Sequence, residues 1–192
     1  MVGMTSLPGR SASALVVVDA QNQVIGDGWE RDAVVATIRG LVERARDAGA
    51  PVVWIQQTDD EFVEGTQGWD LVDGLEPAPG EPRLRKRYND SFEGTGLDEE
   101  LATAGVGHVV VAGGQTDACI RATLYGALHR GYDATLVGDA HTTEDTTAWG
   151  NAAPGDIVRH ANVTWDGVAL PGRVGRTITA GDVEFALRAE RD

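Results

Sequence analysis

Several chemically informative residue types are scarce in this sequence. Among its 192 residues there is one cysteine, and only one of the 16 basic residues is a lysine. A single cysteine cannot form a disulfide within the chain, which is typical of a protein of the reducing cytoplasm. There are four histidines, of which the first is His108, and they show no metal-ligand spacing. We therefore expect no metal and no other cofactor.

Long apolar runs and an excess of positive charge are also absent. No run approaches the roughly 20 apolar residues of a membrane-spanning helix, and residues 1–13 lack the apolar core of a signal peptide. The formal net charge is −14, from 16 basic and 30 acidic residues. Nucleic acids and anionic membranes both require clustered positive charge, so we expect neither as a partner. The acidity is interpreted as a solubilising surface.

The rest of the sequence alternates apolar strands with helices. Strands are expected at residues 14–18, 51–55, 84–88, 108–112 and 134–137, with a sixth beginning at 162–165. Helices are expected at residues 32–48, 97–104, 117–130 and, in part, 149–160. This alternation predicts an α/β fold with a parallel sheet covered on both faces. We expect one domain over residues 1–192, with an N-terminal extension (1–13), a long surface excursion (59–80) and a C-terminal tail (166–192) without an evident place in it.

Three reactive side chains lie at or just past the ends of predicted strands. Asp19 follows the first strand, Lys86 lies in the third and Cys119 follows the fourth. Ligands bind to parallel sheets at the edge where the carboxyl ends of the strands meet. Taken singly, Asp19 could cap a loop, Lys86 could be a solvated charge and Cys119 could be a small buried apolar residue. Together, a nucleophile, a base and a cation form a candidate catalytic site.

Cys119 and Lys86 each carry a further signal. Residues 113–119 (GGQTDAC) form a glycine-rich turn that leads into a predicted helix. A thiol in a first helical turn lies near unpaired backbone N–H groups, which favour the thiolate and can hold an oxyanion. We therefore predict an unusually acidic thiol. Arginine occupies 15 of the 16 basic positions, so the lone lysine suggests a site where the wider guanidinium does not serve.

Three segments resemble the isochorismatase-like hydrolases, the family that includes nicotinamidases and N-carbamoylsarcosine amidases. Residues 16–22 (VVVDAQN) are similar to the opening Asp-x-Gln motif of that family. Residues 86–97 (KRYNDSFEGTGL) resemble its lysine segment, and residues 110–123 (VVAGGQTDACIRAT) resemble its nucleophile segment. The three motifs occur in the family's order and at matching strand ends.

The resemblance implies a three-layer α/β/α Rossmann-like fold with six mainly parallel strands in the order 3-2-1-4-5-6. It implies that Cys119 attacks a carbonyl group, that Asp19 takes the thiol proton and that Lys86 polarises the site. It also implies a cis peptide bond between Gly114 and Gln115, with the N–H groups of Gln115 and Cys119 as the oxyanion hole. It further suggests a homo-oligomer, either a dimer or a tetramer.

The chain also departs from parts of the family. Nicotinamidases carry an Asp and His metal cluster after the second strand, and this chain has no histidine before His108. The isochorismatases of siderophore pathways lack the nucleophilic cysteine, which is present here as Cys119. Val24 stands where many relatives have an aromatic residue, so ring stacking at that position is in doubt.

Several polar and aromatic residues are weighed for contact with a substrate. The candidate substrate-binding residues are Gln21, Val24, Gln57, Tyr88, Phe92 and His141. Trp54, Trp69 and Trp149 either line the pocket or pack in the core, and both interpretations stay open. We expect His108, His129 and His160 to lie at the surface or at helix ends.

The favoured function is hydrolysis of a C–N bond in a small amide, ureido or N-carbamoyl compound through a thioester. A small-molecule substrate is thus the expected partner. One alternative is vinyl-ether hydrolysis of the isochorismate type, which needs an acid but no thiol. Another is a catalytically silent binding protein on the same scaffold. Nucleotide binding is disfavoured because no Gly-x-Gly-x-x-Gly sequence follows the first strand.

Overall fold

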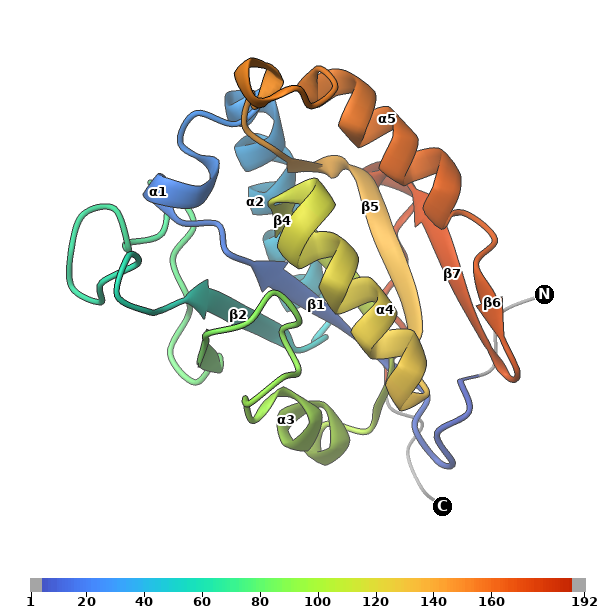
Figure 1. Ribbon diagram of the computed structural model, residues 1–192. Coiled ribbons are helices and arrows are strands. Elements are labelled where there is room, and N and C mark those ends of the chain that lie inside the picture. The colour runs from blue at the N-terminus through green and yellow to red at the C-terminus, as the bar shows by residue number, and fades with distance from the viewer. Residues whose placement is uncertain (1–4, 188–192) are drawn as a thin grey trace.

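Apolar runs buried along their length build the centre of a parallel sheet (Figure 1). The computed structural model describes residues 5–187, so residues 1–4 and 188–192 of the predicted extension and tail lie outside the described part. The strands are β1 (Ala12–Val18), β2 (Val52–Gln57), β3 (Arg83–Lys86), β4 (Val106–Gly114), β5 (Asp133–Thr142), β6 (Ala169–Leu170) and β7 (Arg173–Ile178). The helices are α1 (Asn22–Ile25), α2 (Arg31–Asp47), α3 (Leu97–Thr103), α4 (Arg121–Arg130) and α5 (Pro154–Trp165).

The described residues form one seven-stranded sheet in the order β3-β2-β1-β4-β5-β7-β6. All neighbours pair in parallel except β6 and β7, which are antiparallel. The first five positions follow the predicted order. Because β1 lies between β2 and β4, the residues that follow β1, β3 and β4 come close together at one edge of the sheet.

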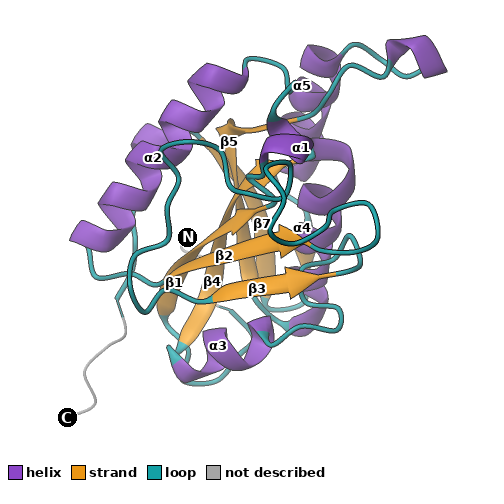
Figure 2. Ribbon diagram, turned by 90° about the vertical axis from the view of Figure 1, so that its left-hand side faces the viewer, coloured by secondary structure: helices purple, strands orange, loops and turns teal. Residues whose placement is uncertain are grey.

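Helices cover both faces of this sheet, as the predicted three-layer fold requires (Figure 2). On one face α3, α4 and α5 contribute apolar residues such as Leu101, Leu124 and Trp165 to a common core. On the other face α2 buries Val35, Ile38 and other residues spaced at helical intervals. No helix among residues 5–187 has the length and apolar character needed to cross a bilayer.

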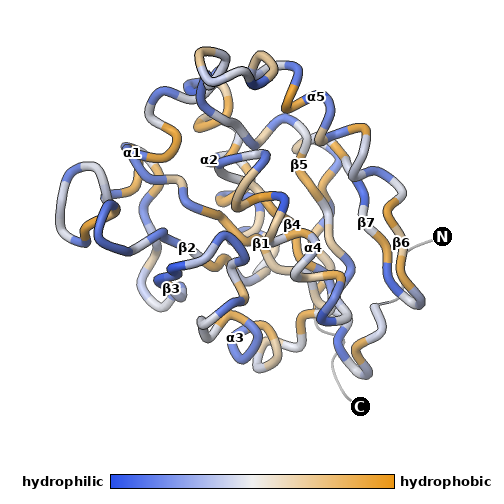
Figure 3. Tube along the Cα trace, in the orientation of Figure 1, coloured by the Kyte–Doolittle hydropathy of each residue, from blue (hydrophilic) through white to orange (hydrophobic). Residues whose placement is uncertain are grey.

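The segment between β2 and β3 is long and mostly irregular, as the predicted excursion at residues 59–80 requires. It is anchored by the buried residues Trp69, Val72 and Leu75 and by a bridge between Leu71 and Gln21. It leads into β3, the strand at the edge of the sheet, which is hydrophilic in Figure 3. Lys86 is the buried residue of this edge strand.

The expected sixth strand at residues 162–165 is wrong, because these residues form the last turn of α5. Pro154 begins the helix at a position where its missing N–H has no cost. Val158 and Trp165 lie buried along the helix, while the β-branched Val163 is 77% exposed. The local strand propensity of this run is thus overridden by helical spacing of its apolar residues.

The sixth position in the sheet is instead filled from the predicted C-terminal tail. β7 pairs in parallel with β5, with Leu136 opposite Thr177, and the two-residue β6 adds a seventh strand that was not predicted. The expectation that this tail had no place in the domain was therefore wrong for residues 169–178.

Candidate active site

Asp19, Lys86 and Cys119 come together at the carboxyl edge of the sheet. Asp19 directly follows β1, Lys86 ends β3, and Cys119 lies in a short π-helix, Thr116–Ile120, between β4 and α4. The first two side chains are buried, and Cys119 is 9% exposed. The sequence predicted an ordinary α-helix from residue 117. A π-helical turn is wider, and such turns are frequent at functional sites.

The backbone at Asp19 is held in an uncommon conformation. Its φ is 48°, in the left-handed region, where non-glycine residues are strained. Val18, directly before it, lies opposite Gly113 of β4. A Cβ atom on Gly113 would lie 1.9 Å from the carbonyl oxygen of Val18, so only glycine allows the two strands this approach. This approach of β4 to β1 directly precedes both Asp19 and the nucleophile segment.

The ammonium group of Lys86 contacts three acceptors. Its Nζ lies 2.7 Å from Oδ2 of Asp19 in an ion pair, donates a hydrogen bond to Sγ of Cys119 at 3.1 Å and donates another to Oε1 of Gln57 at 2.6 Å. Neither carboxylate oxygen of the buried Asp19 receives a hydrogen bond of standard geometry. Asp19 is therefore a buried base whose charge is balanced chiefly by one cation.

Charge balance determines where the protons reside. Burial by itself would lower the pKa of Lys86, but Asp19 and Cys119 together raise it, so the lysine stays protonated. Burial raises the pKa of Asp19 despite the lysine. Burial and the charge of Asp19 raise the pKa of Cys119 to about 12. One buried cation thus supports one anion, and Asp19 and Cys119 share a single proton.

This balance contradicts the predicted acidity of the Cys119 thiol. The helix terminus and Lys86 both favour a thiolate, but burial and the charge of the adjacent Asp19 oppose one more strongly. The resting form is accordingly a thiol beside a carboxylate, and the nucleophile forms by moving the proton from Sγ to Asp19.

The peptide bond between Gly114 and Gln115 is cis, where the resemblance places one. The side chain of Gln115 donates a hydrogen bond from Nε2 to the carbonyl oxygen of Val24 at 3.2 Å. Val24 is 9% exposed, and this bond ties α1 to the turn that precedes Cys119. The N–H groups of Gln115 and Cys119 remain the candidates for an oxyanion hole.

Two hydrogen bonds join the end of β5 to the nucleophile segment, and sequence reasoning missed both. Thr116 Oγ1 lies 2.8 Å from Nδ1 of His141, and Thr143 donates to Oδ1 of Asp117 at 2.8 Å. Nε2 of His141 lies 2.9 Å from Oδ1 of Asn162. His141 is 1% exposed and both of its ring nitrogens are bonded, so it supports the nucleophile segment rather than facing a substrate.

Three further candidates for substrate contact are occupied elsewhere or face outward. Gln21 is buried, and its amide binds the backbone N–H of Gln57 and the carbonyl oxygens of Gln57 and Trp69. Phe92 packs against Tyr132 with ring centroids 5.6 Å apart, and Tyr88 is 60% exposed. Gln57 contacts Lys86 itself.

Sequence reasoning did not single out Asn89, which is exposed. Its Oδ1 lies 3.8 Å from Sγ of Cys119.

The three tryptophans in question lie in different surroundings. Trp54 is buried on the α2 face and donates from Nε1 to Glu81 at 2.7 Å, and Trp69 donates to Thr58 at 2.9 Å. Trp149 is 81% exposed, so it belongs to neither the core nor a closed pocket.

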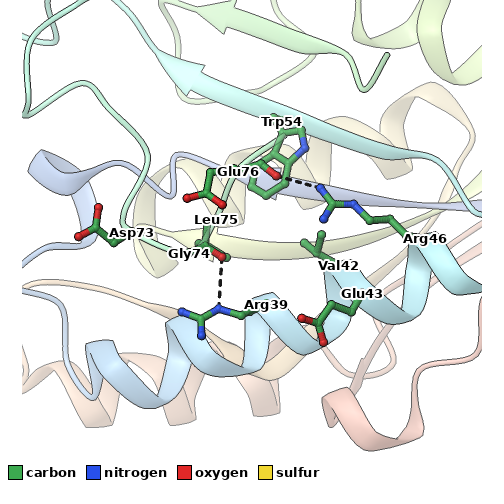
Figure 4. A pocket seen from close by; sticks show the side chains of 9 residues that line it. All are labelled: Arg39, Val42, Glu43, Arg46, Trp54, Asp73, Gly74, Leu75 and Glu76. Carbon is green, nitrogen blue, oxygen red and sulfur yellow. Dashed lines mark hydrogen bonds between the residues drawn. The ribbon is translucent and has the colours of Figure 1, made fainter. Parts of the chain in front are cut away.

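Trp54 also lines a hollow of about 430 Å³ beside α2 (Figure 4). Across this hollow Arg39 donates a hydrogen bond to the carbonyl oxygen of Gly74, and Arg46 donates one to that of Glu76.

His108, expected at the surface or at a helix end, is instead a partly buried residue of a strand. This residue lies within β4, and its ring contacts Ser13 and Thr135. It is far along the strand from the candidate site, near the amino ends of β1 and β5.

Among residues 5–187 no group of three or more histidine, cysteine or acidic side chains is arranged to hold a metal ion.

Comparison with known proteins bears on this geometry. The family model of the isochorismatase domain matches residues 13–160. A streptothricin hydrolase of Streptomyces noursei is 38% identical over 162 residues, which are 81% of this chain and 62% of that protein. The ureidoacrylate amidohydrolase RutB of Enterobacter sp. (strain 638) is 31% identical over 187 residues, covering 71% of this chain and 81% of that protein.

The matched lengths and a solved structure complete the comparison. The chain spans less than two thirds of the length of the streptothricin hydrolases that it matches, at 62% and 51%. The crystal structure of an isochorismatase from Pseudomonas putida KT2440 superposes with a TM-score of 0.79 at 23% identity, covering 90% of each chain. That likeness concerns the fold alone.

Proposed function

The chain belongs to the isochorismatase family, and from this premise we propose that it is a cysteine hydrolase of C–N bonds in small amide, ureido or N-carbamoyl compounds. The observation that carries the proposal is the contact set of Lys86, which lies 2.7 Å from Asp19 Oδ2 and 3.1 Å from Cys119 Sγ. The names of the similar streptothricin hydrolase and ureidoacrylate amidohydrolase support the same class of reaction.

In the first half of the proposed reaction, Cys119 Sγ attacks the carbonyl carbon while its proton passes to Asp19. The carbonyl electrons move to oxygen, and the N–H groups of Gln115 and Cys119 are the proposed donors to that oxyanion. When the oxyanion collapses, the C–N bond breaks and the leaving nitrogen takes the proton from Asp19. The products of this half are the amine or ammonia and a thioester on Cys119.

In the second half, Asp19 is again a carboxylate and removes a proton from a water molecule. The resulting hydroxide attacks the thioester carbonyl, and the C–S bond breaks. The thiolate that leaves recovers its proton from Asp19, which restores the starting state. Lys86 remains protonated throughout and limits the charge in the buried site to one negative unit at a time.

A substrate screen with a matched variant tests this proposal. Ammonia release would be measured over a panel of small carboxamides, ureido acids and N-carbamoyl compounds, with and without a chelator. We expect turnover in both conditions, and a loss of at least about 1,000-fold in Cys119→Ala, because removal of a catalytic nucleophile acts on that scale. A thermal melt confirms that the variant is folded.

Other outcomes of this screen would favour the alternatives. Turnover of a vinyl ether that persists in Cys119→Ala would indicate isochorismatase-type chemistry without a covalent intermediate. Tight binding of a panel member without turnover would indicate a silent binding protein. Activity that disappears on chelation and returns with zinc would contradict the metal-free mechanism.

We also propose that the protein works in the cytoplasm as a homo-oligomer, a dimer or a tetramer. Family resemblance supports this, and the exposed Trp149 and Val163, at 81% and 77% exposure, are candidates for the interface. Sedimentation at micromolar concentration should give a mass of two or four chains. A monomer alone under these conditions would contradict the proposal.

A further inference from the structure

Gln57 lies beside Lys86 and is itself held from behind. The two residues are register partners at the ends of β2 and β3, and Oε1 of Gln57 accepts the hydrogen bond from Lys86 Nζ at 2.6 Å. Nε2 of Gln57 donates to Oδ2 of Asp59 at 2.6 Å and to the carbonyl oxygen of Arg87 at 3.2 Å. Because both of those partners are acceptors, the amide oxygen has to be the atom that faces the lysine.

This contact restricts how the ammonium group can be oriented. An ammonium has three N–H donors. One is directed at Gln57 and one at Cys119, which leaves the remaining one on the side of Asp19. The amide is a neutral acceptor, so it orients the lysine without adding a charge. A carboxylate in its place would compete with Asp19 and Cys119 for the single cation.

We propose that Gln57 is a positioning residue of this hydrolase, which holds the Lys86 ammonium between Asp19 and Cys119 while Asp59 holds the Gln57 amide. The inference rests on the proposed function. It differs from the sequence expectation that Gln57 contacts a substrate. Its side-chain oxygen and nitrogen are already bonded within the protein, and its backbone N–H binds Oε1 of Gln21 at 2.8 Å.

A substrate-free experiment tests the contact directly. The rate of Cys119 alkylation by iodoacetamide would be followed against pH in wild type, Gln57→Glu and Gln67→Glu. Cys119 is the only cysteine in the chain, so the signal is unambiguous. Gln67 has an exposed side chain in the excursion at residues 59–80. Its substitution by glutamate makes the same change of charge away from Lys86.

The charged groups around Gln57 determine the expected direction. They are Lys86, Asp19 behind it, Asp59 on the other side of the amide, and Arg87, whose charge acts on Asp59. A glutamate at position 57 adds a negative charge next to the cation that would stabilise the thiolate. At any pH below the pKa of the thiol, the alkylation rate of Gln57→Glu should therefore be lower than that of wild type by about 10-fold or more, and Gln67→Glu should follow wild type.

A second variant separates positioning from substrate binding. Gln57→Met keeps the approximate length of the side chain but has no strong acceptor for the lysine. We expect kcat to fall by about 10- to 100-fold with little change in KM, because the misplaced group acts in the reaction step. A rise in KM with kcat preserved would instead identify Gln57 as a substrate contact and overturn the proposal. Should Gln57→Glu fail to fold, this variant carries the test.

The alkylation experiment and the substrate screen together separate this inference from the proposed function. An alkylation profile of Gln57→Glu that coincides with wild type would overturn the positioning role, whatever the substrate screen finds. If the profile shifts while Cys119→Ala retains full turnover, the contact with Lys86 stands and the cysteine mechanism fails.

Discussion

Two polar clusters lie at opposite ends of the same strands. At the carboxyl end, Asp19, Lys86 and Cys119 form an ion pair with an adjacent thiol. At the amino end, His108 of β4 lies between Ser13 of β1 and Thr135 of β5. Both clusters contain a titratable group that is at least partly removed from water, yet their hydrogen bonding differs.

The amino-end cluster consists of neutral groups that satisfy one another. Nδ1 of His108 lies 3.1 Å from Ser13 Oγ, and Nε2 lies 2.7 Å from Thr135 Oγ1. Burial lowers the pKa of His108 to about 4, with a further contribution from Arg176. Because both ring nitrogens already have hydroxyl partners, we interpret this cluster as structural.

The carboxyl-end cluster retains such capacity. The oxygens of Asp19 receive no hydrogen bond of standard geometry, its backbone lies in the left-handed region, and one proton is shared between Asp19 and Cys119. The comparison teaches that burial of a titratable group does not by itself indicate function. What distinguishes the reactive cluster is a charge held by one partner, next to a nucleophile.

The largest expected effect comes from changing the cation of the reactive cluster. Lys86→Arg keeps the charge, but a planar guanidinium is too wide to contact Gln57, Cys119 and Asp19 from one buried point. We expect kcat/KM to fall by roughly 100-fold or more, the scale on which a misplaced catalytic group acts. Steady-state kinetics on a substrate from the screen measures this.

The matched control is Arg85→Lys on the same strand. Arg85 is exposed and pairs with Glu64 at the surface, where an ion pair contributes little, so this variant should behave as wild type. Near-full activity of folded Lys86→Arg would mean that Lys86 is not a catalytic residue and that only Asp19 and Cys119 remain in the reactive cluster.

A smaller effect, on stability alone, is expected at the amino-end cluster. The pKa of His108 is about 4 in the folded protein against an ordinary value of 6.5. Between these values the unfolded chain binds a proton that the folded chain does not, so stability falls as pH decreases from 6.5 toward 4. At pH 5 this amounts to about 1–2 kcal/mol of unfolding free energy.

Urea unfolding of wild type and His108→Gln at pH 7 and pH 5 measures this contribution. The glutamine can bond to hydroxyl groups but cannot take up the proton, so the variant should lose less stability on acidification. His141, whose pKa burial also lowers, is present in both proteins and cancels in the difference. Equal losses in the two proteins, or a fall in kcat/KM of His108→Gln, would contradict a purely structural role.

Much of the fold could be predicted from the sequence, and the errors have physical causes. The strands that carry Asp19, Lys86 and Cys119 were located because their apolar runs and motifs are local features. The run at residues 162–165 was misassigned, because the helix that begins at Pro154 buries Val158 and Trp165 and overrides local propensity. The π-helical turn around Cys119 likewise has no local signal that periodicity could detect.

The alternation of strands and helices and the three candidate catalytic residues can be recognised from local sequence. The bond between Gln57 and Lys86, the position of His108 between two hydroxyl groups and the weak acidity of the Cys119 thiol follow only from the folded structure. The physical reason is that hydrogen bonds, desolvation and charge pairing depend on distances between residues far apart in the chain. Those distances exist only once the sheet has assembled.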